Sequence, residues 1–383
     1  MMDEIISGKQ PARVLTEIDD RLCNLVQDLD ILSSVTPSNY KQERERFFAQ
    51  HYSIEPNFCY QSNPFDVHQA KRALYELPVE KILNDDLKLL YTDIIQSYAD
   101  KLDQLCSIGE NDFLYNSLRY YGEPSIKDIK NANFLLHLPN EEEETASYDA
   151  IKIEAFMRDF AEQHGYEYNL IISDNMIANA LVVGNNVKIN SAAKLSGQEL
   201  NALAHHELGV HLLTTLNARS QPLKLLNLGC PVNTTTQEGL AILCEFLSGH
   251  FSIKRLRTLA LRVVAVESMI KERDFRSTFL LLKEHYNTDD LTAFTITARV
   301  YRGGGFTKDY LYLKGFSEIL NAYNEMGSDF NYLLCGKTEL KYIPQIKRLI
   351  AQDILLAPKL ISPAITDPQV TNPIYQFVTQ ALR

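Results

Sequence analysis

Apolar residues recur at helical spacing in two stretches near the start of the chain. They fall every three or four positions within residues 12–35, and residues 79–106 show the same pattern. Such a period places apolar side chains on one face of a helix. The apolar positions are Val14, Leu15, Ile18, Leu22, Leu25, Val26 and Leu29 in the first stretch and Ile82, Leu87, Leu90, Ile94, Tyr98 and Leu102 in the second. The pattern predicts two helices, joined by a polar and aromatic loop that contains Pro56 and Pro64.

A mixed pattern follows in the middle of the chain. After a helical stretch at 148–163, residues 168–172 are apolar and β-branched, which predicts a strand. Two further apolar runs, 180–183 and 187–189, flank the sequence Gly-Asn-Asn at 184–186, which is typical of a hairpin turn. The sequence therefore predicts a small antiparallel sheet.

A buried helix is expected next. Ser196 and Glu199 have the spacing of a capping box, in which each side chain bonds the backbone N–H of the other residue. The helix that they open extends to about Leu216. It carries apolar residues on most sides, namely Leu200, Leu203, Leu208, Val210, Leu212 and Leu213. A helix of this kind belongs in the protein interior.

The sequence Pro-Asn-Glu-Glu-Glu-Glu at 139–144 separates the helical pattern from the mixed one. We place a boundary there, between an N-terminal helical region at 1–140 and a second region at 141–383. The length of 383 residues allows either two domains or one continuous domain. The predicted fold class is α+β and predominantly helical.

Composition and charge narrow the classes of partner. The formal net charge is −11, so we expect no nucleic-acid partner, because phosphate binding needs a basic face. No apolar run is long enough for a membrane span, and the first residues lack the pattern of a signal peptide, so we expect no membrane association. The six cysteines are scattered without a paired motif. In a chain of this length they indicate buried thiols and a cytoplasmic location.

The predicted buried helix contains the strongest chemical signal, the sequence His206-Glu207-Leu208-Gly209-Val210-His211. Zn²⁺ binds neutral imidazole nitrogens and carboxylate oxygens, and a catalytic site keeps one position for water. A glutamate beside the first histidine can take the proton of that water. We therefore expect His206 and His211 to bind zinc and Glu207 to act as the general base.

The two histidines are five residues apart rather than four. Five residues turn through about 500° in an ideal helix, which leaves the side chains roughly 140° apart. A single π-helical turn would bring them together, and such turns are frequent at functional sites. Gly209 lies between the histidines and tolerates unusual backbone conformations. We predict that the helix is widened around residues 208–210.

A third ligand is expected from a second helix. Glu238, within Thr-Gln-Glu-Gly-Leu-Ala at 236–241, follows a polar run and begins an apolar helical stretch. Glu245 lies on the same predicted helical face and is either a substitute ligand or a carboxylate that orients a histidine. The alternative to the metal site is a set of core histidines that form ordinary hydrogen bonds. His205 is expected either to be structural or to support a metal ligand, and not to bind the metal itself. Cys230 and Cys244 are expected to pack in the core.

Three segments together resemble a known family. They are His-His-Glu-Leu-Gly-Val-His at 205–211, Thr-Gln-Glu-Gly-Leu-Ala at 236–241, and Ala-Arg-Val-Tyr-Arg-Gly-Gly-Gly-Phe-Thr-Lys-Asp-Tyr-Leu-Tyr-Leu-Lys-Gly at 298–315. They are similar to the QEGLA-motif proteins, which include the microtubule-associated tyrosine carboxypeptidases. The resemblance implies a zincin-like metallopeptidase core, with the H-E-x-x-x-H histidines and Glu238 as zinc ligands and Glu207 as catalytic residue. It does not carry the tubulin substrate over to this chain.

The third segment concentrates basic and aromatic residues. Arg299, Arg302 and Lys308 surround three glycines, and arginine and lysine are suited to bind a free C-terminal carboxylate. Tyr312 is a further candidate for substrate binding. Tyr301 and Tyr310 are close to it in the sequence and could also contact substrate or an oxyanion. The alternative is a basic, glycine-rich surface loop.

These observations predict a zinc-dependent peptidase, and the resemblance favours a metallocarboxypeptidase that acts on peptide or protein C-termini. The hairpin strand near residues 179–181 could hold the substrate backbone by strand addition. Two alternatives remain. One is an endopeptidase or aminopeptidase on the same metal site, and the other is a non-catalytic regulatory protein that keeps the fold.

Overall fold

The structure is a computed structural model that describes residues 12–27, 29–61, 66–139, 145–174, 176, 178–230, 233–370 and 372–382. The chain begins with seven helices and one short 3₁₀ turn. They are α1 (Ala12–Val26), α2 (Ile31–Ser34), α3 (Tyr40–Ala49), α4 (Val67–Tyr75), η1 (Val79–Lys81), α5 (Asp85–Cys106), α6 (Phe113–Tyr121) and α7 (Ile126–Leu136). Most of the charged break that was expected at 139–144 lies outside the described residues.

Capping side chains explain why the two predicted N-terminal helices are shorter than their apolar patterns. The first pattern is divided, because Asp30 accepts a hydrogen bond from the backbone N–H of Ser33 and so begins α2 as a separate helix. The second begins at Asp85 rather than near residue 79. There the side chain of Asn84 accepts from the backbone N–H of Leu87, and two aspartates occupy the first turn.

The strands form two small sheets. Their bounds, with the helix between the first two, are β1 (Tyr148–Asp149), α8 (Ala150–His164), β2 (Asn169–Ser173), β3 (Ala180–Val183), β4 (Asn186–Asn190) and β5 (Lys194–Leu195). β3 and β4 form the predicted antiparallel hairpin, and β1 pairs antiparallel with β5. β2 lies on the other side of β4 and runs parallel to it, so the three-stranded sheet is mixed. The prediction of a small antiparallel sheet holds for two of the three strand pairs.

The remaining described elements are all helical. It comprises α9 (Gly197–His206), the π-helical segment η2 (Glu207–Leu212), α10 (Leu213–Arg219), α11 (Leu225–Leu228), α12 (Asn233–Leu247), α13 (Ile253–Glu272), α14 (Phe275–Leu280), η3 (Leu281–His285), α15 (Asp290–Tyr301), η4 (Arg302–Gly304), η5 (Thr307–Tyr310), α16 (Leu311–Met326), η6 (Gly327–Cys335), η7 (Leu340–Tyr342), α17 (Ile343–Ala351), α18 (Pro363–Thr366) and α19 (Pro373–Ala381). None of the described helices has both the length and the apolar character needed to cross a membrane.

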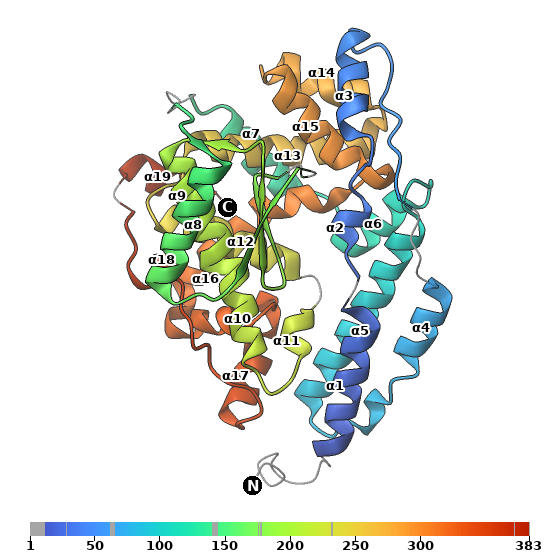
Figure 1. Ribbon diagram of the computed structural model, residues 1–383, viewed down its shortest axis with the longest axis vertical. Helices are drawn as coiled ribbons and strands as arrows, with labels where there is room; N and C mark the ends of the chain where they lie inside the picture. Colours follow the sequence, from blue (N-terminus) through green and yellow to red (C-terminus); the bar gives the residue numbers. More distant parts are fainter. Residues whose placement is uncertain are drawn as a thin grey trace.

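Two hydrophobic clusters hold these elements together. The larger one is built on α12, α13 and α16 and includes side chains of the sheet, α6, α7 and α8. The smaller one joins α1, α4 and α5 to α11 and α17, which lie far away in the sequence. Figure 1 shows the N-terminal helices α1, α4 and α5 side by side, across from the face that carries the sheet. Packing therefore joins early and late parts of the chain on both sides of residue 140.

α12 and α16 cross with their backbones in contact, and glycines make this possible. A Cβ atom at Gly239 would overlap the backbone of Gly315, and a Cβ at Gly315 would overlap the carbonyl oxygen of Thr235. Only residues without a side chain allow two helices to approach this closely. Both glycines belong to the sequence segments that carry the family resemblance, and Gly239 directly follows Glu238. The crossing therefore sets the position of Glu238.

Candidate metal centre and active site

His206 and His211 meet because the helix that carries them changes its geometry between them. His206 is the last residue of α9, and His211 lies in η2, whose backbone is π-helical from Glu207 to Leu212. The capping box of Ser196 and Glu199 begins this helix as predicted. The Nε2 atoms of the two histidines are 3.3 Å apart. The predicted widening is therefore confirmed, and it overcomes the five-residue spacing.

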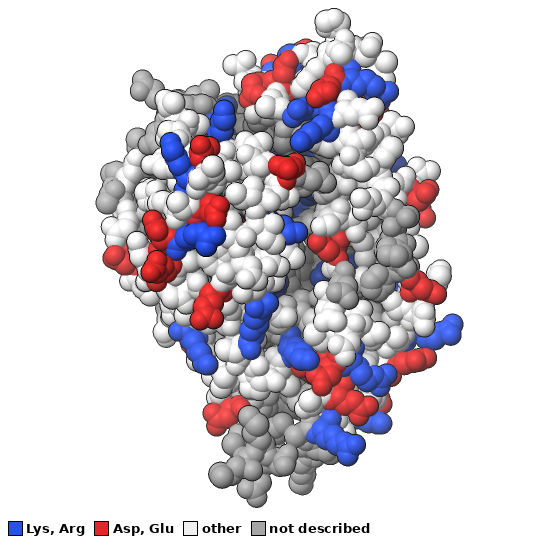
Figure 2. All heavy atoms as spheres, in the orientation of Figure 1, with Lys and Arg blue, Asp and Glu red and all other residues white. Residues whose placement is uncertain are grey.

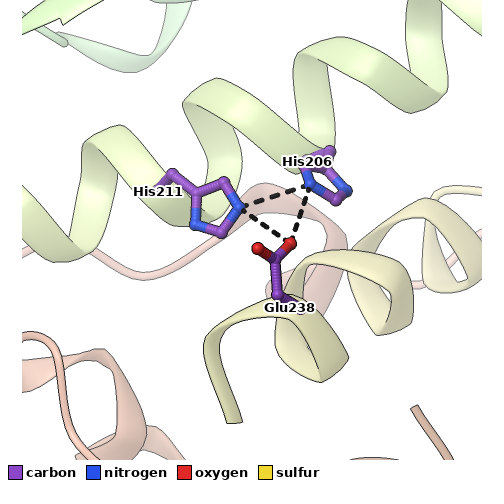
Figure 3. A group of neighbouring side chains, drawn as sticks. All are labelled: His206, His211 and Glu238. Atoms are coloured by element: carbon purple, nitrogen blue, oxygen red, sulfur yellow. Dashed lines mark hydrogen bonds and ion pairs between the residues drawn. The ribbon is translucent and has the colours of Figure 1, made fainter. Parts of the chain in front are cut away.

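Glu238 completes a group of three side chains. It extends from α12 toward both histidines, and its Oε2 atom is 3.7 Å from Nε2 of His206 and 3.6 Å from Nε2 of His211 (Figure 3). In the described part of the chain, these residues form the group of potential metal ligands whose donor atoms lie within 4.8 Å of one another. The structure thus brings together the three residues that were expected to bind zinc.

The donor set fits a zinc ion. Ligand atoms about 2.1 Å from a tetrahedral zinc lie roughly 3.4 Å apart, close to the three separations observed here. The surroundings also favour positive charge. Burial lowers the pKa of His206, but its contacts with Glu238 and Glu245 outweigh burial and raise this pKa to about 10. Two imidazoles and one carboxylate leave a fourth position for water or substrate, as in a catalytic site.

Neighbouring charged groups orient two of these side chains. Glu245 accepts a hydrogen bond at 2.7 Å from Nδ1 of His206, which leaves Nε2 of that ring free to bind a metal. Arg255 donates two hydrogen bonds to Glu245. On the other side, Nζ of Lys308 donates to Oε1 of Glu238 at 2.9 Å, so that Oε2 is directed at the histidines. Of the two roles expected for Glu245, its contact matches the orienting one.

Glu207 is well placed for proton transfer. Its side chain is only 6% exposed, and its Oε2 atom has no hydrogen-bond partner among the described residues. Burial raises the pKa of this carboxyl group, while the nearby charges of His206 and His211 oppose the increase. A buried carboxylate with a free oxygen beside a metal site can accept a proton from water.

The basic segment is buried rather than a surface loop. Gly303, Gly304 and Gly305 all have positive φ angles, which turns the chain sharply between Arg302 and Lys308. A Cβ atom at Gly303 would overlap the ring of Phe113. Arg302 is 6% exposed and Lys308 is 5% exposed. The glycines therefore allow this segment to pack in the interior, close to α6 and the metal group.

The predicted substrate-binding residues have different surroundings. Arg299 is held by Asp309 through two hydrogen bonds, and Lys308 contacts both Glu238 and the hydroxyl of Tyr312. Arg302 stacks on the ring of Phe306, with its Cζ atom 4.8 Å from the ring centre. Within this set, Lys308 contacts Glu238 of the metal group, and Tyr312 contacts Lys308.

Two nearby tyrosines have structural contacts. Tyr310 is 2% exposed and donates a hydrogen bond to the backbone carbonyl of Tyr121. Tyr301 donates to the carbonyl of Asp274. These hydrogen bonds engage both hydroxyls with other elements of the fold, so the structure does not direct either tyrosine toward substrate.

The sequence interpretation missed two arginines of α13. Arg255 holds Glu245, and Arg262 stacks on Tyr312 with its Cζ atom 4.9 Å from the ring centre. They are seven residues apart, so they lie on the same helical face. That spacing, which places both arginines on the same face as the apolar residues around them, was a signal that could have identified them.

His205 points to a different part of the protein. It lines a cavity of about 450 Å³ together with His164 and His250. Its ring packs edge-on against Phe160, and burial lowers its pKa to about 4. His205 is not part of the metal group, in agreement with the structural role expected for it.

The fold and site define a mainly helical α+β protein with a partly buried His-His-Glu group and an adjacent glutamate. The family model described as "Microtubule-associated tyrosine carboxypeptidase" matches residues 45–383. The chain belongs to this family, and the family resemblance noted in the sequence is thereby confirmed.

Three curated relatives share the family name. Microtubule-associated tyrosine carboxypeptidase 1 of Mus musculus is 23% identical over 337 residues, which cover 83% of this chain and 62% of the relative. The protein of the same name from Rattus norvegicus is 22% identical and covers the same shares. The one from Homo sapiens is 23% identical over 76% of this chain and 56% of the relative. The chain thus spans about three fifths of the length of these relatives.

Proposed function

We propose that this protein is a zinc-dependent metallocarboxypeptidase, which removes the C-terminal residue of a peptide or protein. The observation that carries the proposal is the convergence of His206, His211 and Glu238 beside the buried carboxylate of Glu207. Membership of a family described as tyrosine carboxypeptidases supports cleavage at the C-terminal end of the substrate. The relatives' names also make a C-terminal tyrosine the first residue to test.

Each residue of the group has a distinct task in the proposed reaction. His206, His211 and Glu238 would hold zinc, which supplies a Lewis acid for the scissile carbonyl and lowers the pKa of water. Glu207 takes a proton from the attacking water and delivers it to the nitrogen of the leaving amino acid. Lys308 keeps Glu238 in position, and its charge would stabilise the oxyanion that forms at the scissile carbonyl.

The sheet offers a way to hold the peptide backbone. β3 pairs with β4 on one side, and it is an edge strand within the described residues. It also packs against η2, the segment that carries Glu207 and His211. A substrate that pairs with this edge would extend past the metal group, because strand addition supplies backbone hydrogen bonds along the peptide. This proposal keeps the role expected for residues 179–181.

A peptide series tests the proposal. Zinc-loaded protein is incubated with hexapeptides that end in tyrosine, phenylalanine or alanine, each as free acid and as amide and each with an acetylated and with a free N-terminus, and the products are identified by mass spectrometry. We expect loss of one C-terminal residue from free acids only. Internal cleavage of both forms would identify an endopeptidase, and loss of residues from unblocked N-termini only would identify an aminopeptidase. Absence of any cleavage at full zinc loading would contradict catalysis.

A further inference from the structure

A group of buried or half-buried cations lies on α13 and within residues 299–308, namely Arg255, Arg262, Arg299, Arg302 and Lys308. Three of them form ion pairs with carboxylates of the described residues. Arg255 pairs with Glu245, Arg299 with Asp309, and Lys308 with Glu238. Figure 2 shows a groove between the face that carries the sheet and the N-terminal helices, with basic side chains at its floor. The two cations that remain are Arg262 and Arg302.

Neither of these arginines has an ion pair or a hydrogen bond to the part of the chain that is described. The Nε atoms of both are buried without a hydrogen-bond partner. Their guanidinium groups instead lie over aromatic rings, Arg262 over Tyr312 and Arg302 over Phe306. Ring stacking holds a guanidinium in place but leaves its N–H groups available to a ligand.

Both arginines are within electrostatic range of the same ion pair, Arg299–Asp309. Burial lowers the pKa of both Arg262 and Arg302, and the positive charge of Arg299 lowers it further. The negative charge of Asp309 opposes the decrease, and both values fall to about 10. A buried cation surrounded by like charge is unfavourable until an anion binds to it. The cluster therefore has the charge to accept a carboxylate.

We propose that Arg262 and Arg302 together bind the free α-carboxylate of the peptide substrate. The proposal rests on the proposed carboxypeptidase function and adds Arg262, a residue of α13, to the residues that determine its substrate specificity. Arginine can offer two parallel hydrogen bonds to one carboxylate, which fixes the direction of the peptide as well as its end.

A chain of short contacts connects this subsite with the metal group. The ring of Tyr312 lies 4.9 Å from Cζ of Arg262 and 4.6 Å from Nζ of Lys308. Lys308 is in turn 2.9 Å from Glu238. In a carboxypeptidase a single residue separates the scissile carbonyl from the terminal carboxylate, and one residue spans about 3.8 Å. The terminal carboxylate must therefore bind close to the metal, where these contacts lead.

The other cations are positioning residues in this scheme. Arg299 is held by Asp309, which is fully buried. It lies between Arg262 and Arg302 in the sequence, and its positive charge acts on both. Its loss would leave the charge of Asp309 unpaired in the interior. Lys308 is bound to Glu238 and so acts on the metal ligand first.

Binding measurements in a catalytically silent background test the proposal separately from hydrolysis. The zinc-loaded Glu207→Gln variant is titrated with a neutral N-acetylated hexapeptide ending in tyrosine, as free acid and as amide. Adding Arg262→Ala or Arg302→Ala should weaken binding of the free acid about 10- to 100-fold, the range for a hydrogen bond to a charged group. The affinity for the amide should change less than about twofold, because the amide lacks the negative charge that these residues bind.

Matched variants keep the test decisive. Lys271→Ala removes an exposed cation from the same helix and should leave both affinities unchanged. Arg262→Lys and Arg302→Lys keep the charge, and they replace the alanine variants if circular dichroism shows that those are unfolded. A third peptide, amidated and with glutamate as its last residue, separates the terminal carboxylate from an acidic side chain. Binding of this amide as tight as that of the free acid, and lost with Arg262, would overturn the proposal.

The outcomes also separate this inference from the proposed function. If the native protein releases C-terminal residues but both arginine variants bind and cleave free acids normally, the arginine subsite is wrong and the carboxypeptidase remains. If the native protein cleaves nothing while free acids bind through Arg262 and Arg302, the subsite stands and catalysis is wrong.

Discussion

The environment of Glu207 gives the sharpest prediction at the scale of single residues. Glu207→Gln keeps the size of the side chain but cannot accept a proton. Hydrolysis should fall by about 10²–10⁴, the usual contribution of a general base, while zinc content stays the same. Activity is measured as kcat/KM on a free-acid peptide, and zinc by elemental analysis. Glu162→Gln makes the same chemical change at an exposed position of α8 and serves as the control.

The result has a clear alternative reading. A Glu207→Gln variant that cleaves at the native rate would remove Glu207 as the base. A variant that loses both zinc and activity would instead make Glu207 part of the metal-binding group. The sequence motif alone did not separate these roles, since it does not show which carboxylate oxygen is free of hydrogen bonds.

At the scale of helices and strands, local sequence signals predicted much of what forms. The capping box at Ser196, the hairpin around residues 184–186 and the widened turn between the histidines are all present. Each depends on residues that are close together in the sequence, where propensity and spacing act directly. The parallel pairing of β2 with β4 was not predicted, because it depends on how α8 and the hairpin pack after the strand has formed.

The two motif glycines of the site have different importance. Gly239→Ala would place a methyl group into the backbone of α16 and push α12 away, so we expect destabilisation by about 1–3 kcal/mol and weaker zinc retention. Gly209→Ala should be tolerated or should stabilise by up to about 1 kcal/mol. A Cβ there would make only ordinary contacts, the nearest 3.4 Å from Oγ of Ser362. Urea unfolding and zinc analysis of both variants give the comparison.

The structure also corrects the role that was expected for Gly209, which was to permit an unusual backbone conformation. The π-helical turn forms without a positive φ angle at that residue, so its backbone does not require glycine. Equal destabilisation by both substitutions would show that the turn itself depends on glycine. A stable, zinc-binding Gly239→Ala variant would contradict the account of the helix crossing.

At the scale of the whole molecule, the metal group should contribute to stability. It joins α9 and η2 to α12, so removal of zinc by a chelator should lower the melting temperature, and added zinc should restore it. A ligand present at about 1,000 times its Kd stabilises the native state by roughly 4 kcal/mol. Calorimetry of the native protein and of Glu238→Ala tests this, because the variant should respond little to zinc. Equal responses would remove Glu238 from the ligand set.

The sequence could not show how the charges of the whole molecule are arranged. A net charge of −11 argued against a nucleic-acid partner, but it does not show that basic side chains gather in the groove of Figure 2. Arg262 and Arg302 come from separate helical segments, and their lack of carboxylate partners becomes visible only when every neighbour is in place. Motif spacing identified the candidate metal ligands and Arg302 because they belong to short segments, whereas Arg262 could be recognised only in the tertiary fold.

The glycine contact between α12 and α16 has a consequence for synthesis on the ribosome. The residues that meet, Gly239 and Gly315, are far apart in the sequence, so this contact forms late in translation. A nascent chain that ends before residue 315 already contains His206, His211 and Glu238. It lacks the helix that fixes how far the glutamate stands from the histidines. High-affinity metal binding is therefore expected only after most of the chain has emerged from the ribosome. Metal is then bound by the folded site and not by a partly folded chain.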